Sequence, residues 1–311
     1  MPAKETNHPL MLATEEDIVL VRKTLGLTER GLQEDIDAVL DWFQKQPHLV
    51  DGGISRDFIE RMLIINKGSR EKTKTRIDNY FKYRTHAPEL TQNRDVCMSN
   101  HTREPWSFFI QVLIPKLYQG KRITVTKYTD SNPSNFFIDD VFRSSLTFSD
   151  IRLTQDYMLG DVWVIDFKAI GFSHLLRLNP VTLQKAANIF QEGIGMKVNE
   201  IYVLNSMAIF EPVINVLKNF LKPKIMDRII ITNSLEDLHK HIPKSYLPSD
   251  YGGDLPSMEH FRETTIKTFQ TKEMKRYLRA SSKQVSNEKL RPGYDINENC
   301  LAGSFKKLDF D

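Results

Sequence analysis

The chain has 311 residues, of which 40% are hydrophobic and 27% charged, with a formal net charge of +3. This length allows one large domain or two smaller ones with a sizeable core. So small a net charge does not by itself indicate nucleic-acid binding. No run of about 18 apolar residues predicts a membrane-spanning helix, and the N-terminus lacks the apolar core of a signal peptide. Cys97 and Cys300 lie far apart without metal-ligand spacing, which favours reduced thiols and a cytoplasmic protein.

The N-terminal part of the chain has a helical pattern. Apolar residues recur at three- and four-residue spacing over residues 32–43. A second helix is expected over residues 56–66 and a third over residues 70–84, with Ser69 as the N-cap of the third. We therefore expect an all-helical N-terminal domain over residues 1–100.

Strands alternate with helices from Arg122 onward. Because helices separate the expected strands, the pattern favours an α/β fold with a mostly parallel sheet. Residues 161–167 form a nearly continuous apolar run, as expected when both faces of a sheet are covered. We assign residues 101–270 to this domain and residues 271–311 to a C-terminal helix and tail. The expected strands are residues 123–128, 161–167, 201–204 and 229–231.

An amphipathic helix is expected from Phe210 to Leu221. Its apolar residues fall on one side at helical spacing, and charged or amide residues occupy the other. The pattern fits a helix packed permanently on a sheet. The alternative is a gate that closes over a hydrophobic ligand and swings toward a membrane.

Basic residues gather beside this helix. Lys218, Lys222, Lys224 and Arg228 follow one another, and Lys197 precedes the strand before the helix. Such a group is either an ordinary solvated surface or an anion site that binds lipid phosphates.

The sequence contains none of the common catalytic or nucleotide-binding motifs. Asp166 is interpreted as a strand-end carboxylate rather than a general base. His239 and His241 have no third metal-ligand type nearby. We therefore expect no catalytic residue, no metal, no cofactor and no enzyme activity.

Three segments of the sequence carry a family resemblance. They are FIERMLIINKGSREKTKTRIDNYFKYR, DVWVIDFKAIGFSHLLRLNP and INVLKNFLKPKIMDRIIITNSLEDLHKHIPKSYLPSDYGG. Together they resemble the CRAL-TRIO family of lipid-binding proteins over nearly the whole chain. The ending GSFKKLDFD is similar to that of the arthropod branch of the family.

The resemblance implies an N-terminal helical cap followed by a CRAL-TRIO domain with an apolar pocket and an amphipathic gate helix. Ser145 and Ser149 would either orient a polar head group of the ligand or serve helix packing. The pocket wall implied by the resemblance comprises Phe142, Ser145, Leu146, Ser149, Ile165, Ile189, Phe190, Ile194, Met196, Ile201, Phe210, Val213, Leu217 and Leu221.

The resemblance also implies a function and partners. The protein would bind a tocopherol-, retinoid- or carotenoid-like molecule and transfer it between membranes, at which it is peripheral and transient. Lys197, Lys224, Arg228 and Arg61 would bind a phosphoinositide such as phosphatidylinositol bisphosphate, which assists release. A longer, more polar pocket would favour phospholipid exchange instead. The alternative is a lipid-responsive module that recruits protein partners without transporting ligand.

Overall fold

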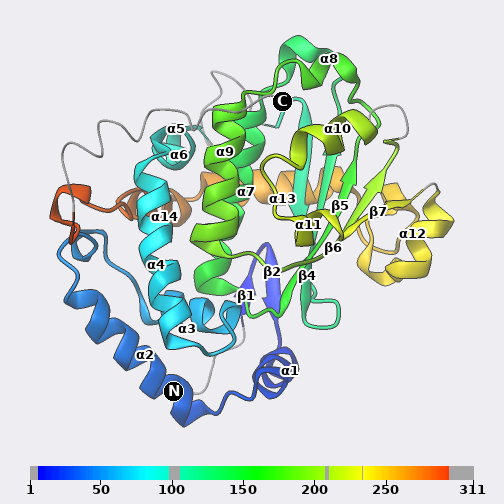
Figure 1. The fold of residues 1–311 in the computed structure, drawn as a ribbon. Helices are drawn as coiled ribbons and strands as arrows, with labels where there is room; N and C mark the ends of the chain where they lie inside the picture. The colour runs from blue at the N-terminus through cyan, green and yellow to red at the C-terminus, as the bar shows by residue number, and fades with distance from the viewer. Residues whose placement is uncertain (1–5, 98–105, 207–209, 233, 294–311) are drawn as a thin grey trace.

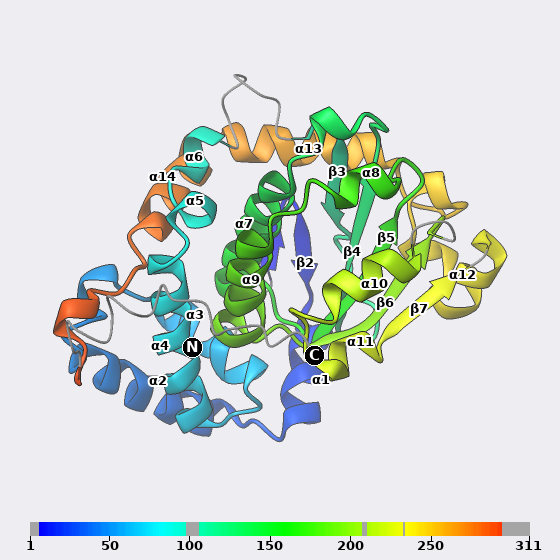
Figure 2. The same ribbon diagram turned by 45° about the horizontal axis from the view of Figure 1, so that its top comes forward.

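A computed structural model describes residues 6–97, 106–206, 210–232 and 234–293 (Figure 1). A five-stranded sheet lies at one side of the molecule, and the long helices α7 (Ile138–Gln155) and α9 (Pro180–Asn188) cover one of its faces (Figures 1 and 2). The N-terminal helices lie on the far side of α7 and α9. Among the described residues, no helix has the length and apolarity needed to cross a bilayer.

The sheet confirms the predicted α/β fold. Its strand order is β3-β4-β5-β6-β7; β4 to β7 are parallel, whereas β3 runs antiparallel at the edge. The four expected strands are all present, and β3 is an addition that the sequence analysis missed. The strands are β3 (Phe109–Leu113), β4 (Lys121–Tyr128), β5 (Gly160–Asp166), β6 (Val198–Leu204) and β7 (Ile229–Thr232).

The two faces of the sheet are packed differently. Successive side chains of a strand point to opposite faces. On β5, Val162 and Val164 are fully buried in a core with α12 (Leu235–His241) and α13 (Met258–Gln270). The alternate residues Trp163 and Ile165 are only half-buried, although helices cover their face too. The solid core therefore lies on one side of the sheet, and incompletely filled space lies on the other.

The N-terminal helices form the second core. Ser55 and Ser69 accept N-cap hydrogen bonds at the starts of α3 (Arg56–Ile65) and α4 (Arg70–Thr85), which confirms these two predicted helices. Their apolar faces pack together with α2 and with the outer sides of α7 and α9. The other helices of this part are α1 (Glu15–Leu25), α2 (Glu29–Gln44), α5 (Pro88–Thr91) and α6 (Arg94–Cys97).

Residues 6–13 differ from the predicted all-helical unit. A hairpin of β1 (Thr6–His8) and β2 (Met11–Ala13) precedes α1, and the Leu12 N–H donates to the carbonyl of Pro115 at 2.8 Å. Helix α1 packs with Leu117 and Tyr157 of the α/β part. Residues 6–25 are therefore attached to the sheet domain. The helical spacing of apolar residues in α1 does not indicate this attachment.

A buried ion cluster joins both parts of the chain. The Asp150 carboxylate on α7 pairs with Arg84 of α4 at 2.9 Å and with Arg94 of α6 at 2.5 Å, and all three side chains are buried. Burial alone would raise the pKa of Asp150, but the two guanidinium groups hold it below its usual value. The Ser281 hydroxyl of α14 (Lys272–Ser282) also reaches this carboxylate.

The chain beyond α14 packs against the N-terminal helices up to Ser286. The Gln284 carbonyl accepts a hydrogen bond from Arg84 at 3.0 Å, and the buried Ser286 bonds with Thr85. Cys300 and the predicted arthropod-type ending fall in residues 294–311, outside the described part of the chain.

Candidate functional site

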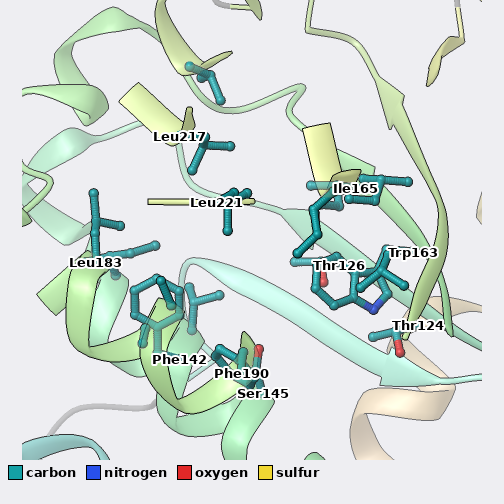
Figure 3. A pocket seen from close by; sticks show the side chains of 18 of the residues that line it. Thr124, Thr126, Phe142, Ser145, Trp163, Ile165, Leu183, Phe190, Leu217 and Leu221 are labelled. Atoms are coloured by element: carbon teal, nitrogen blue, oxygen red, sulfur yellow. The ribbon is translucent and has the colours of Figure 1, made fainter. Parts of the chain in front are cut away.

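A cavity of about 310 Å³ lies between the sheet and the α7–α9 layer. Strands β4, β5 and β6 form its floor, and α7, α9 and the π-helix after α9 (Ile189–Ile194) form its wall. Helix α10 (Phe210–Leu217) and the segment after it close the remaining side (Figure 3). The lining is almost entirely apolar, so the cavity suits a hydrophobic guest.

The floor follows from strand periodicity. Thr124 and Thr126 of β4 and Trp163 and Ile165 of β5 are alternate residues that share one face of the sheet, and Figure 3 shows their side chains directed into the cavity. Their neighbours in sequence point into the solid core. The half-burial of Trp163 and Ile165 thus reflects exposure to an internal space.

The wall is held in place by the N-terminal helices. A Cβ atom at Gly193 would lie 3.2 Å from Cα of Tyr80, so α4 approaches the π-helix at backbone distance. Arg76 of α4 donates to the carbonyls of Gln191 and Glu192 at 2.5 and 2.9 Å. These contacts satisfy carbonyls of the irregular turn, and they fix the wall away from the sheet.

The gate is shorter than predicted. Helix α10 ends at Leu217, and residues 218–221 form turns before Pro223 begins the short α11 (Pro223–Met226). The Gln191 side chain bridges this segment, since it donates to the Phe220 carbonyl and accepts from the Lys222 N–H, both at 2.8 Å. The gate is therefore tied to the wall at its C-terminal end.

The apolar residues of α10 lie against the cavity rather than in a solid core. Val213, Ile214 and Leu217 line the cavity, and all three are half-buried. The side chain of Phe210 lies outside the described part of the chain.

The structure brings together most of the predicted pocket residues. Ten of the fourteen line the cavity: Phe142, Ser145, Ser149, Ile165, Phe190, Met196, Ile201, Val213, Leu217 and Leu221.

Three predicted wall residues lie elsewhere. Leu146 and Ile189 are fully buried in the N-terminal helical core, and so is Ile194, which also lines a separate cavity of about 30 Å³. Leu146 follows the cavity residue Ser145, and one step along a helix rotates a side chain by about 100°. The carried-over positions are thus wrong as cavity lining, because they face the opposite side of the same layer.

The cavity has further lining residues that the sequence analysis missed. Strand alternation from Ile165 points to Trp163 and Phe167, so this signal was available in the sequence. Tyr128 and Phe136 depend on how β4 ends and how the chain returns to α7, which no local pattern indicates. The missed residues include Gln111, Thr124, Thr126, Tyr128, Phe136, Trp163, Phe167, Leu183, Ser206 and Phe220.

The two predicted polar anchors already have protein partners. The Ser145 hydroxyl exchanges hydrogen bonds with the Gln111 amide at 2.9 and 3.2 Å, and Gln111 also donates to Thr126. The Ser149 hydroxyl donates to the Ser145 carbonyl at 2.8 Å. These contacts favour the packing role for both serines.

Basic side chains gather around Lys197, at the start of β6. Partial burial and four neighbouring cations lower the pKa of the Lys197 ammonium below its ordinary value. In order of falling influence these cations are Lys67, Arg228, Lys121 and Lys224. Mutual repulsion of this kind is relieved when an anion binds between the charges.

Arg61 differs from the other predicted anion ligands. Its guanidinium donates to the Asp156 carbonyl at 2.9 Å and to the Glu60 carboxylate at 2.8 Å, and it lies over the Tyr157 ring. By contrast, Lys197, Lys224 and Arg228 form no ion pair with any described residue. Arg61 is therefore committed to the protein interior, and we leave it out of the anion site proposed below.

The remaining candidates have structural roles. Asp166 accepts hydrogen bonds from the Lys168 N–H, Asn205 and the Tyr251 hydroxyl, as expected of a strand-end carboxylate. His239 bonds with the Tyr251 carbonyl at 2.8 Å. In the described part of the chain, no three His, Cys, Asp or Glu side chains converge to hold a metal ion.

Comparison with known proteins agrees with this arrangement. The family described as "CRAL/TRIO domain" matches residues 109–253, and the family described as "Pinta-like, UBA domain" matches residues 28–101. The human protein named alpha-tocopherol transfer protein-like is 25% identical over 249 residues, which cover 77% of this chain and 70% of that protein.

Two further proteins show similarity. Clavesin-1 of Xenopus laevis is 26% identical over 247 residues, which cover 78% of this chain and 74% of that protein. The solved structure titled "Crystal structure of Sfh5" has a TM-score of 0.45 and 13% identity, covering 66% of this chain and 74% of that chain.

Proposed function

We propose that this chain, which belongs to the CRAL-TRIO family, binds one small lipophilic molecule in the cavity beneath α10 and transfers it between membranes. Proteins of this family bind and transfer small lipophilic ligands. The observation that carries the proposal here is the apolar cavity of about 310 Å³ under the gate.

The size of the cavity favours a particular ligand class. Pockets for drug-sized molecules span roughly 300–1,000 Å³, and this one lies at the lower end. A tocopherol- or retinoid-like molecule with one isoprenoid chain suits it better than a phospholipid with two acyl chains. Burial of about 300 Å² of apolar ligand surface would contribute roughly 7 kcal/mol. Escape into water is then slow, so release requires another apolar destination.

Exposed apolar side chains beside the gate support a membrane as that destination. Phe172 and Leu176, in and just after α8 (Phe172–Leu175), are 60% and 74% exposed, and Val181 at the start of α9 is 48% exposed. Helix α8 contacts α10. A cluster of this kind marks an interaction surface rather than ordinary solvent exposure. A cytoplasmic protein that docks transiently on membranes fits this surface.

The cluster of Lys197, Lys224 and Arg228 would bind an anionic lipid head group at the same surface. Helices α8, α10 and α11 follow one another across one face of the molecule (Figure 1). A phosphoinositide bound at this cluster would draw the start of α11 toward the membrane. It would favour the open gate only through a higher affinity for that state.

Vesicle transfer of a fluorescent tocopherol or retinoid tests the proposal. We expect ligand to pass from protein to acceptor vesicles, and faster when they contain phosphatidylinositol bisphosphate. Each cation near an anionic surface contributes about 1 kcal/mol, so Lys224→Ala/Arg228→Ala would lower binding to these vesicles by a factor of tens.

Lys272→Ala/Arg276→Ala is the matched control, since it removes one exposed lysine and one exposed arginine from α14. Unchanged transfer by the first variant would refute the phosphoinositide role. A ligand that binds but never leaves for any vesicle would refute transfer and favour the lipid-responsive interaction module.

A further inference from the structure

Two buried hydroxyl groups at one end of the cavity have no hydrogen-bond partner among the residues that the structure describes. Tyr128 and Ser206 both line the cavity and are 8% and 2% exposed. Neither the Ser206 hydroxyl nor the Tyr128 phenol bonds with a described residue. A buried hydroxyl without a partner costs about 1–3 kcal/mol. Natural interiors seldom keep such groups without a reason.

The two hydroxyls come from the carboxyl ends of β4 and β6, the two strands that flank β5 in the sheet. Tyr128 is the last residue of β4, and Ser206 follows the end of β6 by two residues. Asn205 has a positive φ of 55°, which redirects the chain, and its amide is held by Asp166 at 2.8 Å. This turn places Ser206 in the lining instead of continuing the strand alternation.

Aromatic rings surround this end of the cavity. The ring of Tyr128 lies nearly parallel to that of Phe167, with centroids 5.7 Å apart and an interplanar angle of 19°. The ring of Phe136 lies 6.0 Å away and tilted. Both phenylalanines line the cavity. We call Tyr128, Phe136, Phe167 and Ser206 the aromatic end.

Several other polar groups of the lining are less available to a ligand. Gln111, Thr126, Ser145 and Ser149 bond with one another or with the backbone. Arg152 is the only charged side chain among the lining residues, and its guanidinium pairs with Asp156 and Asp161 at 3.2 and 2.7 Å. No uncommitted charge in this lining awaits an ionic ligand.

We propose that the aromatic end binds the polar terminus of the ligand, which is an uncharged alcohol or carbonyl group. The Tyr128 phenol donates to the oxygen of this group, and the Ser206 hydroxyl accepts from an alcohol or donates to a carbonyl. The ring or first isoprene unit next to the oxygen lies against Phe136 and Phe167. The apolar tail then extends along the cavity toward Ile201 and Ile229. This inference rests on the proposed function and adds the orientation and head-group chemistry of the ligand.

The opposite orientation makes a distinct prediction. Thr124 lies four residues before Tyr128 on β4, about 13 Å along the strand. Thr124 and its register partner Trp163 also line the cavity and make no hydrogen bond through their side chains with a described residue (Figure 3). A ligand bound in reverse would place its oxygen there.

Matched ligand pairs separate these orientations. We would measure affinities of retinol and α-tocopherol, and of analogues lacking only the hydroxyl group, by quenching of tryptophan fluorescence or by competition. If retinol or α-tocopherol binds, we expect the full-length protein to bind that alcohol more tightly than its analogue without the hydroxyl group. Tyr128→Phe and Ser206→Ala would each lower the affinity for the alcohol about tenfold and leave that for the hydrocarbon unchanged. Thr124→Val is the matched loss of one hydroxyl and should change neither.

Folding is monitored by the thermal midpoint of the empty variants. Loss of an unpartnered hydroxyl should leave this midpoint unchanged or raise it. The proposed orientation would be overturned if only Thr124→Val lost the preference for the alcohol. It would also be overturned if Tyr128→Phe and Ser206→Ala both kept that preference unchanged. If neither skeleton bound the unmutated protein, the proposed function itself would fail and this inference with it.

Discussion

The empty space beside the sheet predicts unequal costs for two identical substitutions. Ile123→Ala and Ile165→Ala each remove three carbon atoms, from adjacent strands and opposite faces of the sheet. Ile123 is fully buried in the solid core, so its truncation combines the lost transfer free energy with a new void, at about 2–5 kcal/mol. Ile165 already borders the cavity. Three methylenes are worth roughly 2.4 kcal/mol when fully buried, so we expect about 1 kcal/mol from a half-buried side chain.

For ligand affinity, the order of the two substitutions is the reverse of their order for stability. The cavity-facing Ile165 contacts a bound lipid, so Ile165→Ala should weaken ligand binding several-fold, whereas Ile123→Ala should leave the affinity of the folded protein unchanged. Chemical denaturation of the delipidated variants gives both unfolding free energies, and a ligand titration gives the affinities. Equal costs in the delipidated protein would mean that side chains fill the space beside Ile165, and the reasoning would be refuted.

Two further perturbations test how the cavity is enclosed and held. Asp150→Asn should cost about 3–5 kcal/mol, because Arg84 and Arg94 would lose the charge that compensates their burial. The pKa of Asp150 is held below the ordinary value of 3.8, so its stabilisation is complete above that pH and is lost as the pH falls through the depressed value. Acid unfolding of the variant should lack this component, and an identical acid profile would contradict the assignment. Gln191→Ala removes two hydrogen bonds between residues 220–222 and the wall, each worth about 1 kcal/mol, and leaves the Lys222–Glu192 ion pair at 2.5 Å in place; it should speed ligand release to vesicles several-fold. Gln184→Ala is its control, because among the described residues the Gln184 side chain bonds only Asn188 in α9. Equal release rates would show that this tie does not restrain the gate.

Local patterns in the sequence were sufficient for most of the secondary structure. The apolar run at residues 161–167 became β5, and the capping serines 55 and 69 began the two expected helices. The helix expected through Leu221 ended at Leu217 instead. The hydrogen bonds of Gln191 and of the Asn219 amide to this segment mark the end of the helix, and the apolar periodicity does not show them.

The candidate site was predictable to the extent that strand and helix periodicity are. Ile165 and Ile201 lie on the cavity face of their strands, and alternation from Ile165 also indicates Trp163 and Phe167. The predictions for Leu146 and Ile189 were wrong because both sides of the α7–α9 layer are covered. An apolar residue there is equally suited to the helical core and to the cavity.

The amino-acid sequence by itself determined most strands and helices, and the apolar character of the surfaces that meet beneath α10. Only the tertiary structure decided that these surfaces stay apart, because a void depends on the distance between layers, and that distance is set by contacts such as Gly193 against Tyr80. It also decided which polar groups remain free. Ser145 and Tyr128 both carry a hydroxyl. Gln111 of β3 bonds with the Ser145 hydroxyl, whereas no described residue bonds with the Tyr128 phenol.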